Sequence, residues 1–318
     1  MASTRTFRIG TRGSLLARWQ SDWVAARLAD CGVAVEIVEI ATLGDVRQVG
    51  PVAGLGATGV FTKEIQAALV GGKVDLAVHS LKDLPTLGVE GLALAATPPR
   101  ESPLDALVDA QRRTLATLPE GARVGTGSLR RRAQLLHLRA DLEIVPVRGN
   151  VETRLRKATD GELDAVVLAA AGLQRLGWGD QIAELLGPPQ MLPAPGQGAL
   201  AIEARRDDAE ALAVAATLDD AATRWATTAE RSALAALEGG CSAPIAAWGR
   251  LSGGRLLLDA VAADADGRRA LRASGAIELA ERGRAAALEA AAALGQQVAE
   301  ELRGQGAAEL IGLRRPGD

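Results

Sequence analysis

Apolar and polar positions follow two different periods along the first two thirds of the chain. Segment 14–30 repeats apolar residues at helical spacing through Leu16, Trp19 and Trp23, and it therefore predicts an amphipathic helix. Segment 33–40 (VAVEIVEI) is β-branched and almost continuously apolar, which is typical of a strand buried on both faces. Helix-like and strand-like segments keep alternating after it, and this order predicts parallel sheets flanked by helices.

The other elements of these two thirds follow the same alternation. Helices are expected at 61–72, 128–138 and 151–161, and strands at 7–10, 74–79, 122–126, 142–147, 164–170 and 199–205. Segments 98–103 (PPRESP) and 187–198 (GPPQMLPAPGQG) are rich in proline and glycine, so they are expected to connect two lobes. The strand-like stretch after the second connection indicates that the chain re-enters the first lobe.

The pattern changes near residue 221. A helix, apolar strands around 255–264 and a long alanine-rich helix predict a third, smaller α+β domain. The fold class is therefore α/β, with two lobes and this third domain. The expected domains are residues 1–98 together with 199–217, residues 103–193, and residues 221–318.

One motif occurs twice. IGTRGSLL at 9–16 and VGTGSLRR at 124–131 share the order strand, Gly-Thr, Gly-Ser-Leu, helix. Each places a serine, Ser14 or Ser128, at a helix N-cap beside free backbone N–H groups that favour anions. Plain capping is the alternative for either copy alone. Because arginine lies close to both copies, the pair suggests two lobes that present helix N-termini to a shared cleft.

Composition excludes several classes of protein. The chain is 48% hydrophobic but contains no run of 18 apolar residues, so no membrane span is expected. The N-terminal MASTRTFRIG lacks the apolar stretch of a signal peptide, which predicts a cytoplasmic protein. Two cysteines and two histidines make a poor ligand set, so no metal site is expected. A reducing compartment and the unlike contexts of Cys31 and Cys241 argue against a disulfide. Segment 54–59 (GLGATG) follows loop-like residues rather than a strand, which excludes a dinucleotide site there.

Arginines crowd residues 130–157, although the net charge of the whole chain is only −3. A nucleic-acid surface would interleave aromatic residues for base stacking, but aromatic residues make up 2% of the chain and none lies in this stretch. Guanidinium groups bind the carboxylates or phosphates of a small ligand as well as they bind a nucleic acid. A small polyanionic ligand is therefore favoured over nucleic acid, with a solvated helix face as the third possibility.

Two further stretches carry candidate chemistry. In LEGGCSAPI, Cys241 follows two glycines and precedes Pro244, where neither helix nor strand continues easily. Cys31, in ADCGV, is instead expected to be buried where a helix ends and packs on the next strand. In VDLAVHSLKDLPT, Lys82 and Asp83 follow an apolar strand, and ligands of open α/β sheets lie at such strand ends. A solvated Lys-Asp turn is the simpler alternative.

Taken together, seven stretches resemble the porphobilinogen deaminase family, also called hydroxymethylbilane synthases. They are TRGSLLA, HSLKDLPT, GTGSLRRRAQL, VRGNVETRL, LAAAGLQRLG, LPAPGQGALAIE and LEGGCSAPI. They lie in collinear order from about residue 8 to 250. The resemblance implies two lobes like those of periplasmic binding proteins plus a third domain. It also implies a transferase of tetrapyrrole biosynthesis that joins four porphobilinogen molecules into 1-hydroxymethylbilane and releases ammonia.

The resemblance also assigns roles to residues. Cys241 would carry a dipyrromethane cofactor through a thioether, because a thiolate on an accessible loop is the bond-forming species. Asp83 would be the catalytic carboxylate, beside the pyrrole nitrogens. The residues implied to bind the cofactor are Arg12, Ser14, Lys82, Thr126, Ser128, Arg130 and Arg131. Those implied to bind the substrate are Arg148, Asn150, Arg154 and Arg175.

The chain departs from the family pattern at two positions. Thr58 stands where lysine is common and Gly127 where serine is common, so two contacts to the ligand are missing from the expected set. The expected partner is porphobilinogen, with no nucleic acid and no membrane, and the protein is expected to be a monomer. The alternatives from other classes are a ligand-binding module of the periplasmic type and a nucleic-acid-binding protein that uses the 130–157 arginines.

Overall fold

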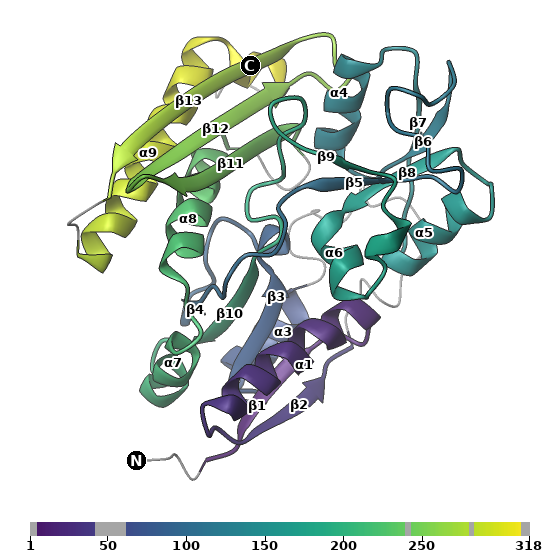
Figure 1. The fold of residues 1–318 in the computed structure, drawn as a ribbon. Coiled ribbons are helices and arrows are strands. Elements are labelled where there is room, and N and C mark those ends of the chain that lie inside the picture. The colour runs from purple at the N-terminus through teal and green to yellow at the C-terminus, as the bar shows by residue number, and fades with distance from the viewer. Residues whose placement is uncertain (1–4, 42–61, 239–242, 280–282, 313–318) are drawn as a thin grey trace. The chain divides into compact units, whose positions relative to one another are not determined.

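The computed structural model describes residues 5–41, 62–238, 243–279 and 283–312. The chain divides into two compact units, one of residues 1–101 and 198–224 and the other of residues 102–197 and 225–318. Three sheets are present in the described residues, two with five strands and one with three (Figure 1). The second unit contains both the second five-stranded sheet and the three-stranded sheet. The predicted separation of residues 103–193 from 221–318 therefore stays a prediction.

The first lobe is built on a sheet with the strand order β2-β1-β3-β10-β4. Its strands are β1 (Phe7–Thr11), β2 (Val35–Glu39), β3 (Leu76–Ser80), β4 (Leu92–Ala96) and β10 (Leu200–Arg205). Its helices are α1 (Leu15–Asp30), α3 (Lys63–Val70), α7 (Ala209–Ala216) and the short 3-10 turn η2 (Leu81–Asp83). Leu76 and Val78 of β3 pack with α1 on one face, while Ala77 packs with α3 on the other. The alternation of side chains along one strand thus places helices on both faces of the sheet.

The second lobe repeats this plan with the strand order β7-β6-β8-β5-β9. Its strands are β5 (Asp105–Val108), β6 (Arg123–Gly125), β7 (Glu143–Val145), β8 (Ala165–Ala169) and β9 (Glu184–Leu186). Its helices are α4 (Leu129–Leu138), α5 (Val151–Thr159), α6 (Ala170–Arg175) and the short η3 (Gly179–Gln181). Val167 of β8 packs with α4, whereas Val166 packs with α5 and α6 on the opposite face.

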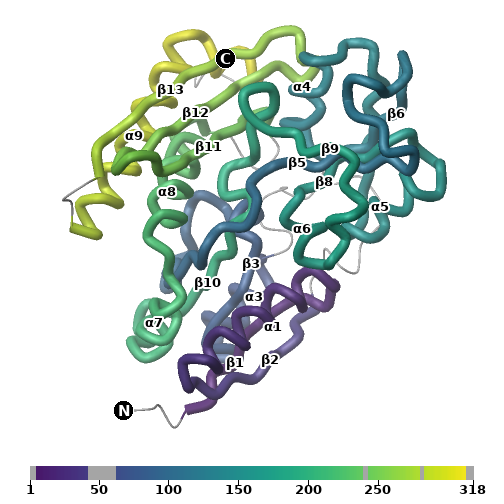
Figure 2. Tube along the Cα trace, in the orientation of Figure 1, coloured from purple at the N-terminus to yellow at the C-terminus, as the bar shows by residue number. Residues whose placement is uncertain are grey.

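The third sheet is an antiparallel meander. It consists of β11 (Ile245–Ser252), β12 (Arg255–Ala263) and β13 (Ala270–Glu278), and it is accompanied by α8 (Ala221–Ala236), α9 (Arg284–Gly304) and α10 (Ala307–Leu310). Leu256 and Leu258 of β12 face α8 and α9 and form one apolar core with them. The yellow end of the tube in Figure 2 follows α9 along this sheet. The expected α+β character after residue 221 is confirmed.

The prediction of parallel sheets was only partly right. Strands β1, β2 and β3 are parallel, and so are β6, β7 and β8. However, β10 runs antiparallel to both β3 and β4, and β5 runs antiparallel to both β8 and β9. These two strands follow proline-rich connections rather than crossover helices, and only a crossover returns the chain to the same end of a sheet.

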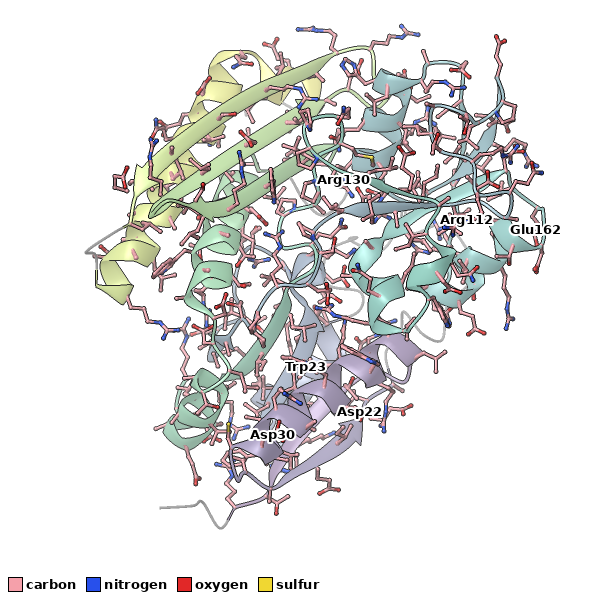
Figure 3. All side chains as sticks on the ribbon, in the orientation of Figure 1. Asp22, Trp23, Asp30, Arg112, Arg130 and Glu162 are labelled. Carbon is pink, nitrogen blue, oxygen red and sulfur yellow. The ribbon has the colours of Figure 1, made fainter. Side chains whose placement is uncertain are left out.

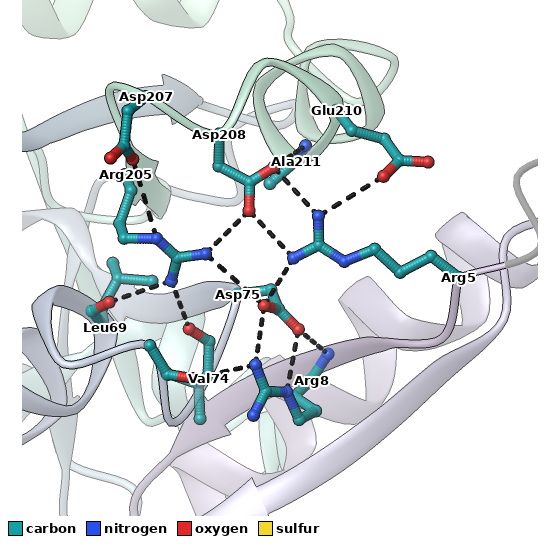
Figure 4. Close-up of polar contacts among 11 residues, drawn as sticks. Arg5, Arg8, Leu69, Val74, Asp75, Arg205, Asp207, Asp208, Glu210 and Ala211 are labelled. Carbon is teal, nitrogen blue, oxygen red and sulfur yellow. Dashed lines mark hydrogen bonds and ion pairs between the residues drawn. The ribbon is translucent and has the colours of Figure 1, made fainter.

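An ionic network holds the first lobe together at one edge of its sheet (Figure 4). Asp75, which directly precedes β3, accepts hydrogen bonds from Arg5 at 2.6 Å and from the Nε of Arg8 at 3.0 Å. Asp208 caps α7 and is bound by Arg5 at 2.9 Å and by Arg205 of β10 at 2.8 Å. The network therefore ties β1, β3, β10 and α7 at the amino end of the parallel strands. We name it the Asp75 cluster.

Candidate functional site

Four of the predicted site residues lie together at one edge of the first lobe. Arg12 and Ser14 follow β1, and Lys82 and Asp83 follow β3. Because β1 and β3 are paired and parallel, their carboxyl ends lie at the same edge of the sheet. This edge is opposite to the one that holds the Asp75 cluster.

The turn that carries Lys82 and Asp83 is anchored on both sides. Leu81 and Leu84 are 0% and 5% exposed, and the N–H of Leu81 donates to the carbonyl of Ala199 at 3.0 Å. Between these anchors the side chain of Asp83 is exposed. Its carboxylate makes no hydrogen bond or ion pair within the described part of the chain. A rigid turn thus presents a carboxylate whose oxygens are open to a ligand or a proton.

The other predicted residues lie at the corresponding edge of the second lobe. Strands β7, β6 and β8 are neighbours and parallel, so their carboxyl ends also meet at one edge. The residues that follow these strands are Thr126, Ser128, Arg130 and Arg131 after β6, Arg148, Asn150 and Arg154 after β7, and Arg175 at the end of α6 after β8. Each lobe thus gathers its own set of predicted residues at one edge of its sheet.

Serine capping of the two repeated motifs is confirmed. The Oγ of Ser14 accepts from the N–H of Ala17, and the Oγ of Ser128 accepts from the N–H of Arg131, both at 3.4 Å. Asn150 caps α5 in the same way and accepts from the N–H of Thr153 at 2.8 Å. These bonds account for the local role of the three side chains. Their roles toward a ligand stay predictions.

Arg130 and Arg131 are buried rather than exposed. Their side chains are 4% and 7% exposed, and both guanidinium groups bind Asp105, the first residue of β5. Arg130, labelled in Figure 3, points from the start of α4 toward that strand. Burial opposes the ionisation of Asp105, but the charges of Arg130 and Arg131 outweigh it and hold the pKa of Asp105 well below its usual range. The two arginines therefore already share one carboxylate, and their binding to a cofactor stays a prediction.

Sequence reasoning missed Asp105 and Gln197. The Nε2 of Gln197 donates to Asp105 at 2.9 Å and to the carbonyl of Pro103 at 2.7 Å. A charged residue at the start of the apolar stretch LDALV was the available signal, since aspartate is almost never fully buried unless it is paired. Nothing in the sequence indicates its partners, which lie 25 and 26 positions away in α4.

The expected burial of Cys31 was wrong, whereas the helix end expected there is confirmed. Cys31 is exposed and is the C-cap of α1. Cys241, Thr58 and segment 54–59 lie outside the described residues. Gly127 has a local reason, because a Cβ added there would lie 2.7 Å from the carbonyl oxygen of Val147. A serine at that position would need a shift of the backbone.

No described helix is both long enough and apolar enough to cross a lipid bilayer. Within the same residues, no group of three or more histidine, cysteine, aspartate or glutamate side chains could hold a metal ion.

The comparisons with known proteins agree with one another. Residues 7–213 match the family model "porphobilinogen deaminase, dipyromethane cofactor binding domain", and residues 225–304 match "porphobilinogen deaminase, C-terminal domain". The chain is 46% identical over 311 residues to the porphobilinogen deaminase of Syntrophotalea carbinolica, covering 97% of this chain and 96% of that protein. It is 48% identical to porphobilinogen deaminase 1 of Streptomyces coelicolor, covering 98% of each.

Among solved structures, the methionine binding protein MetQ is similar at 13% identity and a TM-score of 0.43, covering 67% of this chain and 89% of that one. A periplasmic substrate-binding protein from Coxiella burnetii is similar at 15% identity and a TM-score of 0.42. The family assignment rests on the family models and the sequence relatives.

Proposed function

The chain belongs to the porphobilinogen deaminase family, and from this premise we propose that it condenses four porphobilinogen molecules head to tail into 1-hydroxymethylbilane, with release of ammonia, on a dipyrromethane held by Cys241. The enzyme is accordingly a transferase of tetrapyrrole biosynthesis. The match of both family models in order, together with relatives that align over nearly the whole chain, carries this conclusion.

The buried arginine pair at the carboxyl edge of the second lobe fits the carboxylates of a dipyrromethane. Each pyrrole ring brings an acetate and a propionate. The second lobe supplies the buried guanidinium groups of Arg130 and Arg131, which share the single carboxylate of Asp105. Guanidinium groups bind carboxylates in a bidentate manner. Arg12, Ser14 and Lys82 from the first lobe and Thr126, Ser128, Arg130 and Arg131 from the second would hold it. When bound, this group supplies the free pyrrole carbon to which the first substrate unit is joined.

Asp83 is assigned the proton chemistry of the condensation. Its exposed carboxylate can accept a proton and can stabilise positive charge at a pyrrole nitrogen. Leu81 and Leu84 fix its position, so the geometry does not have to be organised anew for each of the four additions. Lys82 is assigned to a ligand carboxylate rather than to the proton transfer.

Intact-protein mass spectrometry tests the attachment directly. Active enzyme should exceed its sequence mass by two condensed pyrrole units, and Cys241→Ser should lack the addition. Since Cys31 is exposed, Cys31→Ser is the matched control and should keep both the addition and the activity. A fully active wild type without added mass would contradict the proposal.

Substitution of Asp83 tests the catalytic assignment. Asp83→Asn is nearly isosteric, so the fold should survive while turnover falls at least about a hundredfold, the lower end for acid-base catalysis. Asp22→Asn replaces another exposed carboxylate of the same lobe and should stay near wild-type turnover. A smaller loss for Asp83→Asn would remove Asp83 from the mechanism.

The arginines are proposed to act at different stages. Arg131 belongs to the buried pair and should matter from cofactor assembly onward, whereas Arg175 lies half-buried at the end of α6 and should contact the growing chain. After a pulse of substrate, mass spectrometry of Arg131→Leu should show mostly apo-protein. Arg175→Leu should keep the cofactor and accumulate one to three extra pyrroles. Identical mass ladders for the two variants would contradict this staging.

The protein is further proposed to be a cytoplasmic monomer that binds no nucleic acid. The absence of aromatic residues for base stacking from 130–157, where the arginines are crowded, supports the last point. Sedimentation at several concentrations and a binding titration with single-stranded RNA test the two statements separately.

A further inference from the structure

One carboxylate holds both arginines of the second lobe. Asp105 is 1% exposed, and its Oδ2 accepts from Nη1 of Arg130 at 2.7 Å. Its Oδ1 accepts from Nη2 of Arg130 at 3.1 Å and from Nε of Arg131 at 2.9 Å. The same oxygen lies 2.8 Å from Nη2 of Arg131. We name Asp105, Arg130 and Arg131 the Asp105 cluster.

Neutral groups fix the remaining geometry of this cluster. Arg130 donates to the carbonyl of Leu192 at 2.7 Å, and Arg131 donates to the carbonyl of Val167 in β8 at 3.1 Å. Gln197 donates to Asp105 at 2.9 Å and thereby fixes the carboxylate as well. Both guanidinium planes are therefore set by the strands β5 and β8 and by the connection that contains Leu192 and Gln197.

The Asp105 cluster has an excess of positive charge. Two buried guanidinium groups share one carboxylate, which leaves a net charge of about +1 in a site where uncompensated charge is costly. Both arginines lie in the first turn of α4, where no acidic residue is present. Because the helix dipole favours anions at this end, it adds to the cost of the two positive charges. In addition, the buried Nε of Arg130 has no hydrogen-bond partner among the described residues. Such a local violation is typical of a binding site.

We propose that Asp105 is a positioning residue of the condensation, which orients Arg130 and Arg131 and neutralises only one of their two charges, so that the pair retains one charge for a carboxylate of the pyrrole chain. The inference rests on the proposed function. Asp105 itself acts through the two arginines and is not a catalytic residue.

A matched pair of variants separates positioning from folding. Asp105→Asn removes the charge from the Asp105 cluster and keeps the shape of the side chain. Asp109→Asn is the control, because Asp109 directly follows β5, is 2% exposed and is paired with Arg113 at 2.6 Å. Each variant removes the charge of a buried aspartate that pairs with arginine at an end of the same strand, so both should lose thermal stability.

The two variants should differ in ligand binding. Misplaced guanidinium groups should raise the KM for porphobilinogen about tenfold to a hundredfold, or leave most molecules of Asp105→Asn without the cofactor mass. Asp109→Asn should stay within about twofold of wild type in both readouts. If both variants show equal KM and equal cofactor occupancy, Asp105 has only a structural role and the inference is wrong.

Chemical rescue gives a second, independent test. Asp105→Ala leaves space for a small carboxylate between the two guanidinium groups, so formate at constant ionic strength should restore turnover in a saturable way. Formamide, which has a similar size but no charge, should not restore it, and neither compound should affect Asp109→Ala. Folded Asp105→Ala that formate fails to rescue, or that formamide rescues equally, would overturn the inference.

Failure of the inference can be told apart from failure of the proposed function. A wild type that carries no pyrrole units and forms no bilane contradicts the function itself. A wild type that is active, with Asp105 and Asp109 variants that behave alike, contradicts only the role of Asp105.

Discussion

The Asp75 cluster and the Asp105 cluster use the same side chains for different purposes. In both, a buried aspartate at the start of a strand is held by arginines from distant parts of the chain. The Asp75 cluster lies at the amino edge of the first sheet, where Arg5 and Arg8 are 33% and 39% exposed. The Asp105 cluster lies at the carboxyl edge of the second sheet, and its arginines are 4% and 7% exposed.

Charge balance separates the two clusters further. Arg5, Arg8 and Arg205 meet the two buried carboxylates of Asp75 and Asp208, and the more exposed carboxylates of Glu210 and Asp207 also pair with Arg5 and Arg205. In the Asp105 cluster the excess charge is buried, and no second carboxylate contacts the pair within the described residues. An arginine–aspartate cluster therefore stabilises the fold where water or a second carboxylate compensates its excess positive charge. A cluster whose excess positive charge is buried and has no second carboxylate is suited to bind an anion.

The largest expected effect is the loss of bound cofactor, which should follow a substitution in the Asp105 cluster but not one in the Asp75 cluster. Arg131→Leu removes the excess charge of the Asp105 cluster, and most of the purified protein should lack the two-pyrrole mass. Arg8→Leu removes one arginine of the Asp75 cluster and should leave cofactor occupancy unchanged. Intact-mass spectra of the two variants measure this difference. Equal occupancy would show that the two clusters do not differ in function.

The next effect is on stability and concerns Asp75. Asp75→Asn leaves Arg5 and Arg8 without their shared charge partner. It should lower the free energy of unfolding by about 3 kcal/mol. This value is at the low end for breaking a buried pair, because both arginines reach water. The KM for porphobilinogen should stay within about twofold of wild type. Urea unfolding and steady-state kinetics check the two statements. A large rise in KM would mean that the amino edge also affects the site.

A third prediction concerns acid unfolding. Burial opposes the ionisation of Asp75, but hydrogen bonds from Arg8 and Arg5 outweigh it and lower the pKa of Asp75. Burial also opposes the ionisation of Asp105, but the charges of Arg130 and Arg131 outweigh it and lower the pKa of Asp105. Their folded pKa values lie below the unfolded value of about 3.9, so the stability they contribute is present above that pH. It is lost as the pH falls through the folded pKa.

Urea unfolding at pH 7, 5, 4 and 3 measures this loss. The free energy of unfolding of wild type should fall steeply below about pH 4. Asp75→Asn should show a flatter decline, because one of the titrating groups is absent. An unchanged slope would mean that Asp75 does not differ in pKa between the folded and unfolded states.

The smallest effect is the response to salt. The partly exposed arginines of the Asp75 cluster should be screened by 1 M sodium chloride, where the Debye length is about 3 Å. The difference in unfolding free energy between wild type and Arg8→Leu should therefore shrink by up to about 1 kcal/mol. The difference between wild type and Asp105→Asn should change less, because both guanidinium groups of that pair are buried and buried pairs are screened only weakly. Equal salt responses would contradict the contrast in burial.

Local features of the fold could be predicted from the sequence. The repeated Gly-Ser-Leu motifs predicted N-caps at Ser14 and Ser128, and both are present, because capping depends on residues three positions apart. Apolar periodicity located α1, α4 and α5, as well as β1, β3 and β10. Lys82 and Asp83 follow a strand, as predicted, and the parallel pairing of β3 with β1 in the structure brings them to the same edge as Arg12.

Tertiary structure decided the rest. The antiparallel direction of β5 and β10 depends on where the proline-rich connections lead, which no local pattern encodes. The exposure of Cys31 depends on what packs against the end of α1. The sequence shows that Arg130 and Arg131 are cationic and begin a helix. Only the folded chain brings Asp105 to them from another strand, because charge pairing acts through space between residues that are distant along the chain.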